Sequence, residues 1–229
     1  MWPTSRPVAW RYGSKRANAP VKIVAMTSTL VLASASPARL SLLRAAGIEP
    51  LVVVSRVDED EVSSVIGETP ITELVGALAR AKAEEVATRV HDALVLGCDS
   101  MFEIEGRVWG KPSGPGEAAE RIRAMRGREG TLYTGHHLID TASGQAAGRV
   151  AATTVHFGPM TDAEVDAYVA TGEPLVVAGS FTLDGRSAPF IDGVMGDHTN
   201  VVGLSLPTLR DLLAEFGRSI TELWAQPDD

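Results

Sequence analysis

The feature that most constrains the fold is a short apolar strand that runs directly into a helix start. Leu30 to Ala33 is wholly apolar, which predicts a buried strand. Ser36 can cap the next helix and Pro37 suits its first position, while Gly47 marks its end. This strand, loop and helix predict the opening unit of an α/β protein.

The same alternation continues in the first half of the chain and then changes. A long helix is expected from Thr69-Pro70 to about Val90, and an apolar strand from Ala93 to Gly97. Two longer strands follow one another later, Thr131 to Ile139 and Arg149 to Phe157, and predict antiparallel pairing. We therefore predict an α/β fold with a mixed sheet and flanking helices.

Weaker patterns predict the remaining elements. These are a strand at Leu51 to Val54, a solvated acidic loop at Asp58 to Glu61, a hairpin of Met101 to Ile104 with Arg107 to Trp109, a helix from Glu117 to Met125, a helix with a Thr161 and Glu164 capping box through Val169, segments Phe181 to Leu183 and Pro189 to Ile191 around an Asp184-Gly185 turn, and a helix from Pro207 to Phe216.

Composition excludes several classes of protein. The chain has 229 residues and a net charge of -8, which argues against a general nucleic-acid binder. Cys98 is its one cysteine, so an intramolecular disulfide and a multi-cysteine zinc site are excluded. No apolar run approaches the ~18–20 residues of a membrane span. We expect a cytoplasmic protein.

Residues 1–28 carry basic residues and no acidic residue, which permits two interpretations. One is a signal peptide that ends at Ala33-Ser34-Ala35. The other is a dispensable extension ahead of a natural start at Met26. We favour the second, because cleavage after Ala35 would destroy the first strand and its loop. The expected organisation is this extension, a catalytic domain at 29–217 and a fraying tail at 218–229.

The loop from Ser34 to Arg39 is the first candidate site. A helix N-terminus presents free backbone N–H groups and partial positive charge, which suit an anion. The hydroxyls of Ser34 and Ser36 can donate to phosphate oxygens, and Arg39 can bind phosphate through its planar fork. The alternative is that Ser36 only caps the helix and Arg39 is solvated.

Lys82 and Asp99 are the next candidates. Lys82 lies on the apolar stripe of its helix, so its ammonium must reach solvent or meet an anion. Asp99 follows a buried strand, and ligands of α/β sheets bind beyond the carboxyl ends of strands. Its carboxylate could bind a metal, act as a base toward water, or cap turn amides.

Two further charged segments could complete the site. Lys111, in Gly110-Lys111-Pro112, is a possible phosphate cation or a solvated lysine. One carboxylate of Asp58 to Glu61 could pair with Asp99 around Mg²⁺. By contrast, His136 and His137 are neighbours in a strand and face opposite sides, and Cys98 is expected to be a small buried residue.

The ordered set of segments resembles the Maf family of nucleotide pyrophosphatases. The matching segments are Leu32-Ala33-Ser34-Ala35-Ser36-Pro37-Ala38-Arg39, Val57-Asp58-Glu59, Ala81-Lys82-Ala83, Gly97-Cys98-Asp99-Ser100, Gly110-Lys111-Pro112, Tyr133-Thr134-Gly135, Thr153-Thr154-Val155, Gly172-Glu173-Pro174, Ala178-Gly179-Ser180-Phe181 and Asn200-Val201-Val202-Gly203-Leu204.

The resemblance implies an elongated two-lobed fold with a central cleft, often dimeric. It also implies hydrolysis of nucleoside triphosphates to monophosphate and pyrophosphate with a divalent cation, Mg²⁺ or Mn²⁺. The family's substrate-binding residues correspond to Ser34, Ser36, Arg39, Lys82 and Lys111. Its acidic residues correspond to Glu59 and Asp99 as metal ligands, with Asp99 also the expected proton acceptor.

The sequence departs from the family where specificity is expected. Its pyrimidine-preferring branch and its 7-methyl-GTP-preferring branch carry different residues at the positions of Ala38, Ser100 and Asp184 here. The preferred base therefore stays open. Two other functions also stay open, a non-catalytic nucleotide-binding regulator of cell division and a phosphatase or sugar-phosphate enzyme.

Overall fold

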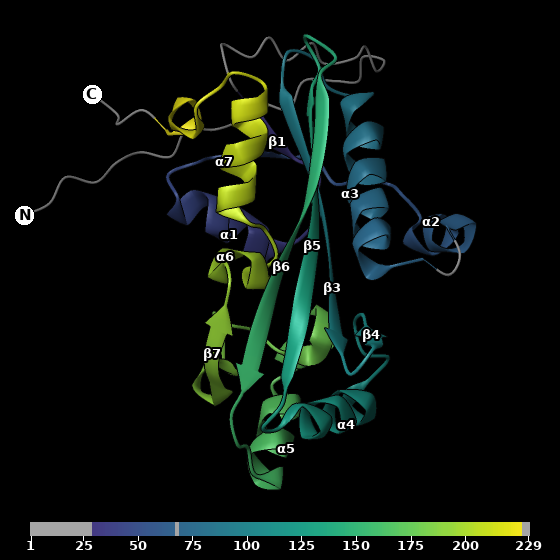
Figure 1. Ribbon diagram of the computed structural model, residues 1–229, viewed down its shortest axis with the longest axis vertical. Coiled ribbons are helices and arrows are strands. Elements are labelled where there is room, and N and C mark those ends of the chain that lie inside the picture. Colours follow the sequence, from purple (N-terminus) through teal and green to yellow (C-terminus); the bar gives the residue numbers. More distant parts are fainter. Residues whose placement is uncertain (1–28, 67–68, 226–229) are drawn as a thin grey trace, which may run out of the picture.

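The computed structural model describes residues 29–66 and 69–225. The predicted N-terminal extension, with its alternative interpretation as a signal peptide, lies outside the described residues. Within them the chain forms one elongated molecule built along three long strands (Figure 1). None of the described helices combines the length and apolar character needed to cross a bilayer.

The described strands form a seven-stranded mixed sheet in the order β2-β1-β3-β5-β6-β7, with β4 paired to β3. β1 is parallel to both of its neighbours, and the remaining pairs are antiparallel. The predicted α/β fold with a mixed sheet is thus confirmed. The strands are β1 (Leu30–Leu32), β2 (Leu51–Val52), β3 (Leu94–Ile104), β4 (Arg107–Trp109), β5 (Glu129–Asp140), β6 (Ala146–Phe157) and β7 (Ile191–Met195).

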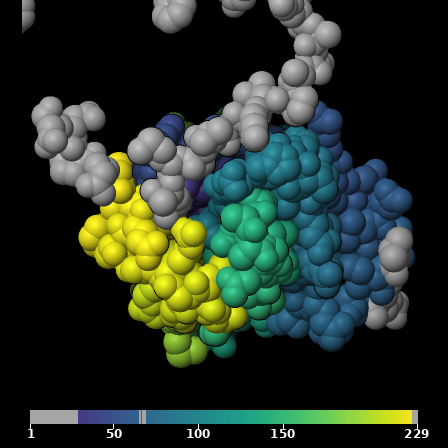
Figure 2. All heavy atoms as spheres, turned by 90° about the horizontal axis from the view of Figure 1, so that it is seen from above, coloured from purple at the N-terminus to yellow at the C-terminus, as the bar shows by residue number. Residues whose placement is uncertain are grey.

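Helices flank the sheet at both ends of the long strands (Figure 1). α3 covers one face at the upper end, α1 and α7 lie on the other side, and α4 and α5 pack at the lower end. Seen from above, the β5–β6 turn lies between the α7 side and the α3 side (Figure 2). The helices are α1 (Pro37–Ala45), α2 (Glu59–Ile66), α3 (Ile71–Ala87), α4 (Pro115–Met125), α5 (Asp162–Ala170), α6 (His198–Val202) and α7 (Leu206–Glu215), with short 3-10 turns η1 (Glu173–Leu175), η2 (Ala178–Ser180), η3 (Ala188–Phe190) and η4 (Ile220–Leu223).

The wholly apolar β1 is explained by burial on both faces. Leu30 and Leu32 pack with residues of α1 and α7, while Val31 and Ala33 pack against α3. Successive strand residues point to opposite faces, so a strand covered on both sides needs an apolar residue at every position. Each fully buried leucine contributes about 1.5–3 kcal/mol through the hydrophobic effect.

Predicted helix starts are confirmed in detail. Ser36 is the N-cap of α1, with its hydroxyl accepting from the backbone N–H of Arg39. Thr161 and Glu164 form the predicted capping box of α5. Local hydrogen bonds fix both features, which is why the sequence alone predicts them.

Two predictions about the middle of the chain are wrong. Asp99 does not follow a strand, because β3 continues from Leu94 to Ile104 and pairs with β5 at Asp99. The acidic segment is not a loop, since α2 begins at Glu59. The Asp58 carboxylate caps it by accepting from the N–H groups of Asp60 and Glu61. Acidic side chains in the first turn of a helix also interact favourably with the helix dipole and so stabilise the helix.

The segment around Asp184-Gly185 lies in turns between η2 and η3, and β7 pairs with β6. One prediction about the C-terminal part is wrong. The tail after residue 217 does not fray as expected up to residue 225. Leu223 is buried and Trp224 forms a bridge to Ile48.

Candidate functional site

The site forms where the parallel part of the sheet ends. β1 pairs with β3 only as far as Leu32 opposite Leu96, and then turns into the Ser34 loop and α1. β3 continues past this point, so Asp99 lies in mid-strand yet beyond the carboxyl end of β1. Because β1 ends beside the longer β3, the loop that follows β1 lies next to the Asp99 carboxylate of β3.

Arg39 holds this junction together. Its Nε donates to Gly203 O at 2.7 Å, and its Nη1 donates to Ser34 Oγ at 3.0 Å and to Cys98 O at 2.9 Å. Its Nη2 donates to Ser100 Oγ at 2.9 Å. A guanidinium has five N–H donors, so contacts with described residues leave one of them for a ligand. If Arg39 is to donate two hydrogen bonds to one phosphate, as its planar fork allows, one of these four bonds must break.

Lys82 lies between two carboxylates. Its Nζ is 2.6 Å from Asp99 Oδ1 and 2.7 Å from Glu59 Oε1. The side chains of Lys82 and Asp99 are 11% and 10% exposed, whereas that of Glu59 is 60% exposed. Of the two alternatives for Lys82, the structure shows that its ammonium meets an anion. α2, α3 and β3 each supply one member of this cluster.

Burial shapes the chemistry of the two neighbouring strand residues. Loss of solvent raises the pKa of Asp99 above its ordinary value, although the charge and hydrogen bond of Lys82 act in the opposite direction. A carboxylate with a raised pKa is a stronger base once it has lost its proton. Burial also raises the pKa of the Cys98 thiol to about 11, so this cysteine is a packed side chain without nucleophilic character.

A second set of polar contacts holds Ser100, the residue that accepts from Arg39 Nη2. Ser100 Oγ lies 2.9 Å from Thr134 Oγ1, which also donates to Asn200 O at 3.4 Å. Asn200 Nδ2 donates to Leu132 O and to Thr153 Oγ1. In the sequence these segments are recognisable only as family matches, because the contacts join residues 34 to 68 positions apart.

His136 is a further buried polar residue that sequence reasoning did not assign. Its Nε2 accepts from the backbone N–H of Ser205 at 2.8 Å, so the neutral ring carries its proton on Nδ1. Burial, followed by the charge of Arg39, lowers the pKa of His136 to about 4. The ring is therefore neutral at physiological pH and joins β5 to the start of α7.

The other predicted site residues described here are not joined to this cluster by hydrogen bonds or ion pairs. Lys111 is exposed and follows Gly110, whose carbonyl accepts from Gly179 N at 3.3 Å. Asp184 is exposed in the segment after η2, and Ala38 is half-buried in α1. The described residues make no hydrogen bond or ion pair between Lys111 or Asp184 and the Lys82 cluster. The structure thus brings together Ser34, Ser36, Arg39, Glu59, Lys82, Asp99 and Ser100.

Glu59 and Asp99 are the oxygen donors of this cluster, and carboxylates are of the type that a divalent cation binds. Glu59 and Asp99 converge on one point, which Lys82 Nζ fills. Among the residues described, no group of three or more histidine, cysteine or acidic side chains could form a full protein cage. Mg²⁺ commonly binds through one or two carboxylates together with substrate phosphates, and this donor set matches that mode.

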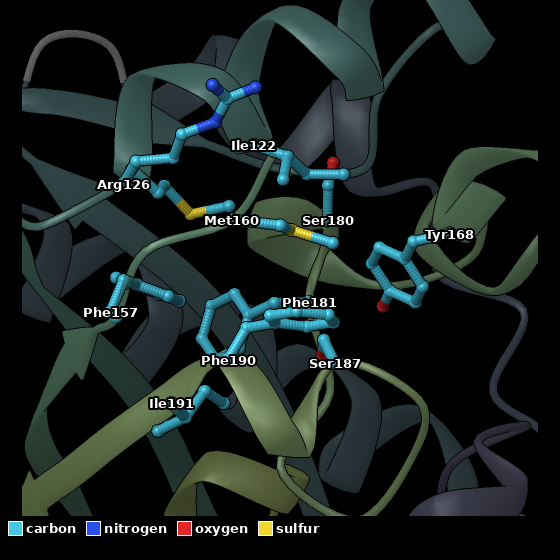
Figure 3. Close-up of a pocket in the computed structure, with 12 residues that line it drawn as sticks. Ile122, Arg126, Phe157, Met160, Tyr168, Ser180, Phe181, Ser187, Phe190 and Ile191 are labelled. Carbon is cyan, nitrogen blue, oxygen red and sulfur yellow. The ribbon is translucent and has the colours of Figure 1, made fainter. Parts of the chain in front are cut away.

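A small cavity at the lower end of the molecule is separate from this cluster. It lies among α4, α5 and the turns η2 and η3 and is lined largely by apolar side chains (Figure 3). Its volume of about 20 Å³ suits a buried water, far less than the ~300–1,000 Å³ of a small-molecule site. Its lining includes Ile122, Met125, Phe157, Tyr168, Ser180 and Phe181.

Comparisons with known proteins identify the family of this chain. Residues 29–216 match the family model described as Maf-like protein. A nucleoside triphosphate pyrophosphatase of Streptomyces coelicolor is 60% identical over 202 residues, covering 87% of this chain and 96% of that protein. Proteins of the same name from Mycobacterium sp. and Microcystis aeruginosa are 50% and 47% identical, covering 88% and 87% of this chain and 100% of each relative. The chain belongs to the Maf family.

Proposed function

We propose that this protein is a nucleoside triphosphate pyrophosphatase. It would hydrolyse the bond between the α- and β-phosphates and release a nucleoside monophosphate and pyrophosphate. The observation that carries the proposal is the buried Lys82–Asp99 pair, with Glu59 on its open side and the Ser34 loop beside it. The names of the similar proteins also support this reaction.

The proposed reaction uses Asp99 as the base. Asp99 accepts a proton from water, whose oxygen attacks the α-phosphorus as the bond to the bridging oxygen breaks. Pyrophosphate leaves with that oxygen. Lys82 lies within hydrogen-bond distance of the base, so its ammonium can stabilise negative charge as it develops on the phosphate oxygens.

The phosphate chain would be held by hydroxyls, backbone amides and cations. Ser34, Ser36 and the start of α1 supply neutral donors, and the remaining N–H of Arg39 adds a charged one. Lys111 would bind the same phosphates as a further cation. Glu59 and Asp99 would hold a divalent cation, Mg²⁺ or Mn²⁺, which when bound supplies positive charge to the phosphate oxygens.

We also propose the organisation that the family resemblance implies. Residues 29–217 would form the catalytic domain of a cytoplasmic homodimer that binds nucleotides and not nucleic acid. The match to residues 29–216 supports the bounds of the domain, and the net charge of -8 supports the absence of nucleic-acid binding. Size-exclusion chromatography with light scattering would test the dimer, and activity of a chain that begins at Met26 would test the dispensable extension.

The decisive experiment is a screen of ordinary and modified nucleoside triphosphates with Mg²⁺ or Mn²⁺. We expect equal amounts of monophosphate and pyrophosphate over many turnovers. Release of orthophosphate would indicate cleavage of another bond. Binding without turnover would indicate the non-catalytic regulator.

Asp99→Asn tests the proposed base in the same assay. Loss of a general base commonly lowers the rate by about 10²–10⁴-fold, and we expect a loss in this range. Asp140→Asn is the matched control, because Asp140 is also buried but caps the turn after β5. Near-normal turnover by Asp99→Asn would overturn the assignment.

A further inference from the structure

Two residues of one helix, α4, form hydrogen bonds with the backbone on both sides of Lys111, and we call this pair of contacts the grip. On one side, Arg121 Nη1 donates to Gly110 O at 2.8 Å. On the other, the backbone N–H and hydroxyl of Ser113 donate to Glu117 Oε2 at 2.7 Å and 2.6 Å. Arg121 and Glu117 lie one turn apart on α4 and are joined by an ion pair at 2.5 Å. The pair therefore spans the two flanks of Lys111.

The arginine end of this grip is itself well supported. The Arg121 side chain is 14% exposed, and its guanidinium lies 5.6 Å from the centre of the Trp109 ring. Trp109 in turn packs on Phe102 of the lower core. Gly110 O also accepts from Gly179 N of η2 at 3.3 Å. One carbonyl next to Lys111 is thus held by two separate elements.

The glutamate end stays charged over a wide pH range. The hydrogen bonds from Ser113 are the main cause, and with Arg121 they lower the pKa of Glu117 to about 2. Glu117 is therefore ionised wherever an enzyme of this kind is assayed.

Lys111 itself has no such support. It is exposed, and within the described part of the chain its ammonium makes no hydrogen bond or ion pair. Its average position is therefore set by the backbone on either side. Arg121 and Glu117 fix that backbone, one before and one after the lysine.

We propose that Arg121 and Glu117 are positioning residues that hold Lys111 where its ammonium meets the phosphate chain of the substrate. This inference rests on the proposed pyrophosphatase function. Orienting a charged group in advance lowers the cost of reaching the transition state, and small misplacements of such groups reduce rates strongly. The sequence signal for this pair is its spacing of four residues, which is typical of a helix ion pair.

A double-mutant cycle tests whether Arg121 acts through Lys111. The proteins are the full chain, Arg121→Ala, Lys111→Ala and the double variant, assayed for kcat/KM with the magnesium salt of the best triphosphate from the screen. We expect Arg121→Ala alone to lower kcat/KM by about tenfold. In the Lys111→Ala background the same change should lower it by less than about twofold.

Two outcomes would overturn the inference. One is an equal effect of Arg121→Ala in both backgrounds, which would mean a general structural role. The other is full activity of Lys111→Ala. Failure of the proposed function would appear differently, as absence of pyrophosphate release by the unchanged protein. In that case the same four proteins are compared for affinity toward inorganic pyrophosphate, where independent effects again overturn the inference.

Matched variants separate this grip from general damage to α4. Arg123 lies on the same helix but pairs with Asp162 and Asp166 of α5, so Arg123→Ala should keep kcat/KM within about twofold. Glu117→Gln keeps an oxygen for Ser113 and should lose less activity than Glu117→Ala. A loss with Arg123→Ala as large as that with Arg121→Ala would contradict the proposal. If Arg121→Ala does not fold, the two Glu117 variants carry the same cycle.

Discussion

Lys82 Nζ and Asp99 Oδ1 lie 2.6 Å apart, and their buried ion pair joins α3 to β3. Neither group could be buried alone at low cost, because a single charge loses its hydration without compensation. The pair therefore links stability to the proposed chemistry. A change that removes the lysine affects both.

Lys82→Met should destabilise the protein by about 3 kcal/mol, because it leaves the Asp99 carboxyl buried without its partner. Adding Asp99→Asn should recover much of this loss, since the buried charge is then absent. Urea unfolding at neutral pH measures both effects. Arg80→Met is the matched control. Its side chain on the same helix is 65% exposed and pairs with Glu84, so its loss should cost less than about 1 kcal/mol. Equal stabilities of the Lys82 and Arg80 variants would contradict the prediction.

His136 should make stability fall as the pH is lowered from about 6.5 to 4. The folded protein holds the ring neutral, with its pKa lowered from 6.5 to about 4, while the unfolded chain takes up the proton below 6.5. The stabilisation is therefore complete above pH 6.5, the pKa of the ring in the unfolded chain. It is lost as the pH falls to about 4, the pKa of the ring in the folded protein. Its full size is about 3 kcal/mol.

Unfolding by urea at several pH values checks this prediction against His136→Gln. The variant should show a flatter dependence of unfolding free energy on pH between 6.5 and 4. His156→Gln is the control, because His156 is 43% exposed on β6 beside Glu129. A pH dependence unchanged by His136→Gln would show that another group is responsible.

Ser100→Ala should weaken the hold on Arg39. It removes the oxygen that accepts from Arg39 Nη2 and contacts Thr134 Oγ1. A buried charged donor that loses its acceptor costs about 2 kcal/mol. The family resemblance implies that Ser100 is a position of base specificity. The contacts instead predict a loss of kcat/KM that is similar for every triphosphate.

Ser100→Thr is the matched variant, because it keeps the hydroxyl. Stability is followed by urea unfolding, and kcat/KM is measured for purine and pyrimidine triphosphates. A changed order of preference among the bases, with stability unaffected, would restore the specificity role.

Gly97→Ala should destabilise the protein by about 3 kcal/mol, because the new Cβ overlaps the backbone of α3. An ideal Cβ at Gly97 would lie 2.2 Å from Ala79 O and 2.8 Å from Ala83 N. Gly193→Ala is the control, since that strand glycine has open space around it. Thermal unfolding should separate the two variants clearly, and similar midpoints would contradict the argument.

The local parts of the fold could be predicted from the sequence. Ser36 and Thr161 cap helices through bonds to residues three positions away, so the pattern contains the whole interaction. β3 could not be predicted at its full length, because its second half depends on pairing with β5 more than 25 residues later. α2 was missed because its acidic first turn is also typical of a solvated loop.

The candidate site was predictable to a similar extent. An apolar stripe around Lys82 indicated that its ammonium could meet an anion, and the structure supplies Asp99. The contacts of Arg39 could not be foreseen, since Gly203 is 164 residues away and its carbonyl has no marker in the sequence. Glu117 and Arg121 had a visible spacing, but only the fold shows that they reach the Lys111 loop.

Gly97 and Gly135 bring the backbone of α3 into contact with the backbone of the sheet. Side chains at these positions would overlap Ala79 O and Val75 O, so there is none to adopt a new rotamer or to be exchanged in evolution. Next to Lys82 and Asp99, α3 and the sheet are therefore in direct backbone contact. In any redesign of this protein, both glycines are positions to keep, because every larger residue there would push α3 and its lysine away from the strand that carries the aspartate.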